Sequence, residues 1–119
     1  MSKISITVDQ DTSTFLPHDV ISGIIEWEPR GSRPIEVNLL YSTSGRGTQH
    51  VELVESIEIP VDVGSANFSF PLPNHPQSFS GELISLTWCL EAINPNAKDS
   101  KRYEFVLSDH GKPIELTKG

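Results

Sequence analysis

Apolar and polar residues alternate with a period of two along most of the chain. In residues 84–92, for example, Leu86, Trp88 and Leu90 are separated by single polar or small residues. Successive side chains of a β-strand point to opposite faces of a sheet, so this spacing places one face in a core. The same alternation predicts strands at residues 4–8, 20–28, 35–41, 51–59, 68–72, 84–92 and 102–107. No segment shows the helical period.

Proline, glycine and short polar runs separate these segments. Pro73, Pro76 and Gly81 lie between the fifth and sixth predicted strands and cannot belong to a continuous ladder, so the chain must cross there. Gly23 lies on the apolar face of the second strand, where it either relieves crowding or marks a bulge. Strands at turn spacings of about 10 residues predict an all-β fold, an antiparallel seven-stranded β-sandwich of immunoglobulin-like build.

The fourth predicted strand, residues 51–59, breaks its own pattern. Val51, Leu53, Ile57 and Ile59 share one face by the period of two, but Glu55 falls on that face as well. A buried carboxylate without a partner is costly. A bulge or an exposed position explains the glutamate better, and the strand is predicted to form the edge of a sheet.

Length and charge narrow the class of protein. The 119 residues fit one domain, placed at residues 4–108, and a tail at 109–119 that either adds a short strand through Ile114 and Leu116 or frays. A net charge of −7 opposes nucleic-acid partners. No segment approaches the roughly 20 apolar residues of a membrane span, so no membrane insertion is expected. The start lacks the apolar core of a signal peptide and Cys89 is the single cysteine, which together predict a cytoplasmic protein.

Candidate catalytic and metal-binding groups are few. Cys89 lies in mid-strand without a neighbouring basic residue, so it is predicted to be a packed thiol rather than a nucleophile. No nucleotide-binding glycine loop or serine-hydrolase motif occurs. The chain has four histidines, His18, His50, His75 and His110, and no two of them have the short spacing that would place them on one metal ion. The sequence therefore predicts a protein that is not an enzyme and needs no cofactor. The least supported alternative is a small metal-dependent enzyme with its ion at Asp9, Asp11, Glu26 or Glu28.

Several segments resemble the arrestin fold in their order and spacing. Residues 16–25, Leu-Pro-His-Asp-Val-Ile-Ser-Gly-Ile-Ile, are similar to the pGd-v-G-v motif of arrestin domains, with His18 in the place of the usual glycine. Phe-Ser-Phe-Pro-Leu-Pro at 68–73, the segment 76–81 and Leu-Thr-Trp-Cys-Leu-Glu-Ala at 86–92 resemble the later F-F-lP, P-S-f-G and i-Y-l-A motifs. The resemblance covers most of residues 4–107 and implies an arrestin-type sandwich.

The resemblance also bears on function. Arrestins and retromer-type adaptors use two such sandwiches to bind receptors, membranes or coats, whereas this chain holds one. A site between two lobes therefore cannot be carried over, and no lysine pair matches the one with which arrestins sense phosphate. The resemblance implies a non-catalytic adaptor that binds a protein partner through loops or an exposed strand edge.

The alternative is an assembly subunit that acts by self-association. A single lobe can recover a bilobed surface by forming a homodimer or by pairing with a different protein. The first strand is the less guarded edge, because no charged residue lies between Lys3 and Asp9. Basic groups in turns or at strand ends are further candidate docking points. The candidate partner-binding residues are Ser5, Thr7, Arg30, Arg33, Lys98, Lys101 and Arg102.

Overall fold

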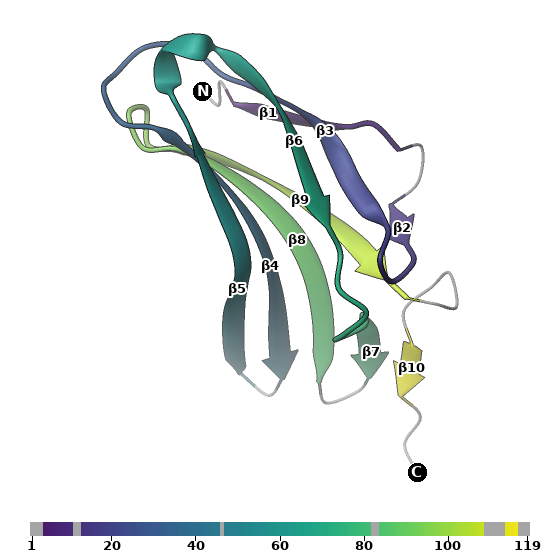
Figure 1. Ribbon diagram of the computed structural model, residues 1–119. Coiled ribbons are helices and arrows are strands. Elements are labelled where there is room, and N and C mark those ends of the chain that lie inside the picture. Colours follow the sequence, from purple (N-terminus) through teal and green to yellow (C-terminus); the bar gives the residue numbers. More distant parts are fainter. Residues whose placement is uncertain (1–3, 11–12, 46, 82–83, 109–113, 117–119) are drawn as a thin grey trace.

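Two β-sheets pack face to face in this chain, whose computed structural model describes residues 4–10, 13–45, 47–81, 84–108 and 114–116 (Figure 1). The small sheet has the order β1-β3-β6, and its strands are Ser5–Val8, Val20–Glu26 and Ser65–Pro71. The larger sheet has the order β10-β7-β8-β4-β5, and β9 pairs with both β8 and β2. Its strands are β2 (Thr14–Phe15), β4 (Ile35–Gly45), β5 (Thr48–Ile59), β7 (Phe79–Gly81), β8 (Ser85–Asn94), β9 (Asp99–Leu107) and β10 (Ile114–Leu116).

The predicted all-β sandwich is confirmed, and its seven strands correspond to β1, β3, β4, β5, β6, β8 and β9. The structure adds β2, β7 and β10, which have only two or three residues each. Such short segments cannot show a period of two. Two of the added pairings, β2 with β9 and β10 with β7, are parallel, whereas the pairings between the longer strands are antiparallel. Strand β10 lies in the tail at 109–119 and contains both residues proposed for a short strand there.

The hydrophobic core fills the space between the two sheets. We call the side of the larger sheet that faces this core the inner face, and the opposite side the outer face. Trp88 of β8 is fully buried on the inner face, where its ring lies 5.1 Å from that of Tyr41 and 6.1 Å from that of Phe105, centroid to centroid. Its indole N–H donates to the carbonyl of Pro76 at 2.7 Å. Trp88 thereby ties the proline-rich crossing to the sheet.

Gly23 relieves crowding, which decides between its two predicted roles. It lies in the regular part of β3, opposite Val8 of β1 and Phe68 of β6, without a register shift. A Cβ atom at this position would overlap the carbonyl oxygen of Thr7 and approach the ring of Phe68 at 2.9 Å. Glycine is therefore needed because the backbone of β1 and an aromatic ring both approach this residue closely.

The molecule is elongated, with extents of 53 × 30 × 22 Å. Figure 1 shows that β4, β5 and β8 continue beyond the ends of β3 and β6, so the small sheet does not cover their hairpin ends. At the other end, η1 (Val61–Val63) joins β5 to β6, and the indole N–H of Trp27 donates to the carbonyl of Val61 at 2.7 Å. The sandwich is thus closed at the η1 end, and the larger sheet projects at the other.

Candidate partner-binding surface

Strand β5 is the outermost strand on one side of the larger sheet. It has 12 residues and pairs with β4, and no strand in the described parts of the chain pairs with its other edge. The backbone N–H and C=O groups on that edge are therefore free to pair with an added strand. The prediction that this segment forms an edge is confirmed.

A β-bulge divides β5 into two parts that present opposite side-chain patterns. Leu39 of β4 pairs with Glu55, whereas the next residue, Leu40, pairs with Leu53, so Val54 is the extra residue. Paired residues share a face of the sheet, and the core residue Leu39 therefore places Glu55 on the inner face. Beyond the bulge, Leu53 lies on the outer face. The structure thus contains both features proposed to explain Glu55, a bulge and an exposed edge.

The bulge also corrects the expected face of two apolar residues. The alternation grouped Val51 and Leu53 with Ile57 and Ile59 on one face. Ile57 and Ile59 do pack against the core, but Val51 pairs with Ser42 and Leu53 with Leu40, which places both on the outer face. One extra residue reverses the face of every residue beyond it, because the side-chain period of a strand is two.

Solvent reaches the whole middle of β5. Every residue from 49 to 56 is exposed. Three of them are large and aliphatic, with exposed fractions of 48% for Val51, 57% for Leu53 and 43% for Val54. Three adjacent exposed aliphatic side chains on a free strand edge are an aggregation hazard unless a partner covers them. We call the free edge of residues 49–56 the β5 edge.

An apolar row on the outer face continues inward from the β5 edge. Leu53 pairs with Leu40 of β4, and Leu40 pairs with Cys89 of β8. Leu40 and Cys89 are only 5% and 4% exposed, although neither belongs to the core between the sheets. Leu53 is thus the exposed end of a small second apolar cluster.

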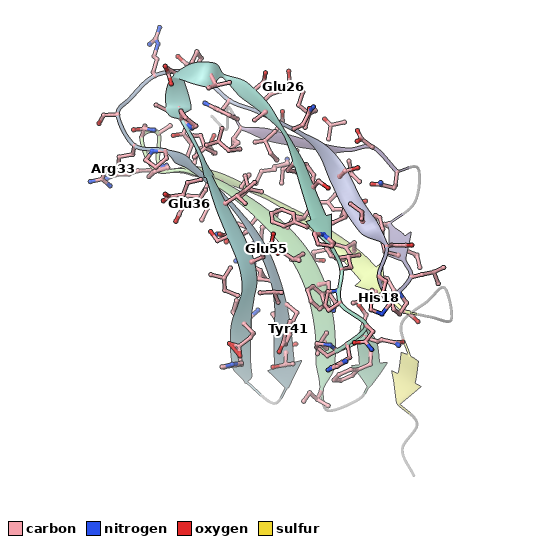
Figure 2. The ribbon with its side chains drawn as sticks, in the orientation of Figure 1. His18, Glu26, Arg33, Glu36, Tyr41 and Glu55 are labelled. Carbon is pink, nitrogen blue, oxygen red and sulfur yellow. The ribbon has the colours of Figure 1, made fainter. Side chains whose placement is uncertain are left out.

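Strand β5 also carries three glutamates, two of them on the face opposite the apolar row. Glu52 and Glu55 lie on the inner face of β5, where Figure 2 shows Glu55 on the same sheet as Tyr41, and Glu58 lies opposite Glu36 of β4. Strand β5 contains no lysine or arginine. Within the described residues, none of these four carboxylates forms an ion pair with a lysine or arginine. The imidazole of His50 lies 3.9 Å from the carboxylate of Glu52. The β5 edge is therefore acidic as well as apolar.

Cys89 is a packed thiol, in agreement with its prediction. It lies on the face opposite Trp88 and is buried. Burial raises the pKa of the Cys89 thiol to about 11, against a smaller lowering effect of Arg102. A thiol with this pKa is almost entirely protonated at neutral pH and is a poor nucleophile.

The first strand provides a second, smaller free edge. Strand β1 is the outermost strand of the small sheet, and Ser5 and Thr7 pair with Glu26 and Ile24 of β3 on the face that points away from the core. Thr7 is exposed and Ser5 is half-buried. β1 has only four residues, so its edge offers far fewer backbone groups than β5.

The five basic residues that were predicted to bind a partner lie near the η1 end but do not form one surface. They are Arg30, Arg33, Lys98, Lys101 and Arg102. Arg30 and Arg102 each contact a carboxylate at 3.0 Å, those of Glu28 and Glu91. Arg102 and Lys101 are adjacent in β9 and therefore point to opposite faces.

Arg33 and Lys98 are brought together by Asn96. The Asn96 carboxamide accepts from the backbone N–H of Arg33 at 2.9 Å and donates to its carbonyl at 2.8 Å, which joins the loop of Arg33 to the turn of Lys98. Figure 2 shows Arg33 projecting from this end of the molecule, away from the hairpin end. The basic residues could be predicted from their charge. The outward-facing Val51 and Leu53 were not predicted as binding residues, although Glu55 on the apolar face of their strand indicated a bulge.

The proposed metal ligands Asp9, Glu26 and Glu28 belong to no metal-binding group within the described residues. Among the described residues, no three His, Cys, Asp or Glu side chains are grouped closely enough to hold a metal ion. Asp9 of the proposed metal set instead accepts a hydrogen bond from the Ser22 hydroxyl at 3.1 Å. Asp11 and His110 lie outside the described residues. No helix in these parts of the chain is long and apolar enough to cross a bilayer.

The fold is an arrestin-type β-sandwich, and comparison with solved structures supports this class. The chain is similar to the crystal structure of Spo0M, a sporulation control protein from Bacillus subtilis, with a TM-score of 0.58 and 13% sequence identity. The match covers 91% of this chain and 49% of the Spo0M chain, so this chain spans about half of its length. At this identity the likeness shows the fold alone. The sequence matches no model of a known protein family and no curated protein.

Proposed function

We propose that this chain is a cytoplasmic, non-catalytic binding module that takes up a protein partner along the β5 edge. The observation that carries the proposal is the combination of a free strand edge with three adjacent exposed aliphatic side chains, Val51, Leu53 and Val54. An added strand would obtain affinity from main-chain hydrogen bonds and specificity from alternate side chains. The likeness to arrestin-type folds agrees with such a role.

Strand length favours β5 over β1 as the docking edge. The exposed part of β5 runs over residues 49–56, whereas the whole of β1 has four residues. Arg30, in a loop, and Arg102, in β9, are less suited to a partner, because each already contacts a glutamate. The partner is therefore expected on the β5 edge, whereas the sequence alone favoured the first strand.

The test is capture of partners on immobilised protein from the native cells, followed by measurement of direct binding with the purified partner. Leu53→Glu adds a charge at the exposed end of the apolar row and should weaken binding at least about tenfold, as expected for a contact worth more than about 1.4 kcal/mol. Leu16→Glu is the matched control, because Leu16 is 51% exposed and lies in the turn between β2 and β3. Equal binding by both variants would exclude the β5 edge.

Self-association through β1 is a second candidate. One observation favours it: β1 is an uncharged strand at the outer edge of the small sheet. Two copies could then form a continuous sheet across a two-fold axis.

A further inference from the structure

We propose that the ligand of the β5 edge is an extended segment of a partner protein in which aliphatic and basic residues alternate. The inference rests on the proposed function, since it names the chemistry of the partner at the same edge. It follows from three properties of β5: the faces of its side chains, the sign of its charges, and the register in which a second copy would have to pair with it.

The faces come first. A strand added to β5 would also present its side chains alternately to the inner and outer faces. Residues opposite Val51 and Leu53 would extend the apolar row that runs from Leu53 to Leu40. Residues opposite Glu52 would lie on the inner face, beyond the small sheet, where solvent reaches both strands. An alternating ligand therefore places its aliphatic side chains on the outer face and its other side chains beside the glutamates.

The charges decide what those other side chains are. The bulge at Val54 brings Glu55 to the same face as Glu52, although an uninterrupted strand would place residues three apart on opposite faces. Strand β5 has no lysine or arginine of its own to pair with them. Opposite charges across two strands are stabilising and like charges directly opposite are destabilising, so lysine or arginine is favoured and aspartate or glutamate disfavoured. The net charge of −7 adds long-range attraction for a cationic segment.

The same charges argue against a second copy of this chain at this edge. In an antiparallel self-pairing, the register that sets Val51 opposite Leu53 of the other copy necessarily sets Glu52 opposite Glu52. This is the antiparallel register that matches both Val51 and Leu53 of each copy, and it sets like charges directly opposite, which is destabilising. The glutamates thus act as guards against self-pairing and as attractive groups for a basic strand.

The experiment uses the full chain and synthetic peptides. In the first peptide, valine and lysine alternate over about seven residues, the length of a typical strand. The second has the same composition with the lysines grouped at one end, and the third has glutamate in place of lysine. Fluorescence anisotropy gives the affinities, and amide hydrogen exchange locates the site. The alternating lysine peptide should bind most tightly, protect amides of residues 49–56, and dissociate more readily at high salt.

Paired variants isolate the role of the carboxylates. Glu52→Gln combined with Glu55→Gln should weaken binding of the alternating lysine peptide by about threefold to tenfold, since each removes one cross-strand ion pair. Glu26→Gln combined with Asp62→Asn changes the net charge equally on exposed residues outside β5 and should leave the affinity nearly unchanged. Equal losses in both double variants would mean that only net charge matters.

The outcomes separate this inference from the proposed function. Equal binding of the alternating and grouped lysine peptides, or retained affinity in the Glu52 and Glu55 double variant, would overturn the alternating basic ligand. A captured partner that loses binding to Leu53→Glu and yet contacts β5 through an acidic or neutral segment would also overturn the alternating basic ligand. That result would leave the proposed function intact. Failure of Leu53→Glu to affect either the peptide or the partner would overturn both.

Discussion

His18 has a backbone conformation that most residues avoid. Its φ angle is 70°, in the left-handed region that favours glycine. It follows Pro17 in a turn where the N–H of Asp19 donates to the carbonyl of Leu16 at 3.0 Å, which is the geometry of a type II turn. The glycine of the arrestin motif corresponds to this residue. The departure from the motif therefore changes the side chain but keeps the conformation that glycine adopts most easily.

We predict that His18→Gly is more stable to urea than His18→Ala by about 1 kcal/mol. A Cβ atom in the left-handed region costs roughly 1–2 kcal/mol, partly offset by the greater flexibility of glycine in the unfolded chain. Histidine should lie between the two, because it tolerates this region better than alanine. Equal unfolding free energies for the glycine and alanine variants would show that the turn relaxes to a negative φ in solution.

The reactivity of the Cys89 thiol depends on its burial. We predict that it reacts slowly with a thiol reagent in the native protein at neutral pH and rapidly in denaturant, because burial raises its pKa from 9.0 to about 11 and shields the sulfur. Fast labelling of the native protein would show that the outer face of β8 opens in solution.

The same pKa shift predicts a loss of stability in alkali. Below about pH 9 the thiol is protonated in both the folded and the unfolded chain, so it contributes no pH dependence. Between about pH 9 and pH 11 the unfolded chain ionises first, which favours unfolding, so stability falls across this range. The test is the difference in unfolding free energy between the wild-type protein and Cys89→Ala. That difference should change with pH only in this window, because the other titrating groups are common to both proteins.

Strand β8 is the central strand of the larger sheet. It pairs with β4 along one edge and with β9 and β7 along the other. Its residues Trp88, Leu90 and Ala92 are fully buried on the inner face.

Trp88→Ala is expected to lower the unfolding free energy by about 3–5 kcal/mol, because it leaves a cavity between Tyr41 and Phe105. It also leaves the carbonyl of Pro76 without its indole donor. Ile84→Ala, at a 46% exposed residue just before β8, should cost less than about 1 kcal/mol. Urea denaturation measures both, and similar small losses would contradict the position of Trp88 in the core.

Within the described residues, basic side chains lie near the η1 end of the molecule and not along β5. The glutamates of β5 line one edge of the projecting sheet, whereas Arg30, Arg33 and Lys98 lie in loops and turns near the η1 end. The two free edges consequently differ: the β5 edge is long, apolar and acidic, and the β1 edge is short and uncharged. Like charges oppose self-pairing on β5, whereas β1 itself contains no charged residue.

If the chain forms homodimers through β1, light scattering at high micromolar concentration should give the mass of a dimer. The backbone N–H of Asp9 donates to Ser22 of β3, and alternate residues of β1 share this direction, so the amides of Ile6 and Val8 point to the free edge and should be protected from exchange in the dimer. Thr7→Lys should then restore the monomer mass, because a charge on an edge strand opposes pairing. Leu53→Glu should leave the dimer unchanged, since it lies on the other edge. A monomer with freely exchanging amides at Ile6 and Val8 would leave only the binding of a different protein.

The strands and most of their inward faces follow from local alternation in the amino-acid sequence. Trp88, Phe68 and Ile25 all lie on the predicted core side. Alternation is a local property of an extended backbone, so it can be recognised in the sequence of each strand alone. The same local signal showed that residues 51–59 could not be a regular buried strand, since Glu55 interrupted the apolar face. The single thiol could likewise be placed opposite Trp88 by counting residues.

Only the tertiary structure decided which surfaces are free and which residues share them. The face of Val51 and Leu53 depends on a bulge at Val54 that is defined by pairing with β4, and their exposure depends on how far the small sheet extends. The proximity of Arg33 to the turn of Lys98 depends on Asn96, 63 residues away from Arg33 along the chain. Such contacts join residues that are distant in sequence, and their energies depend on the partner residue, which no local pattern encodes.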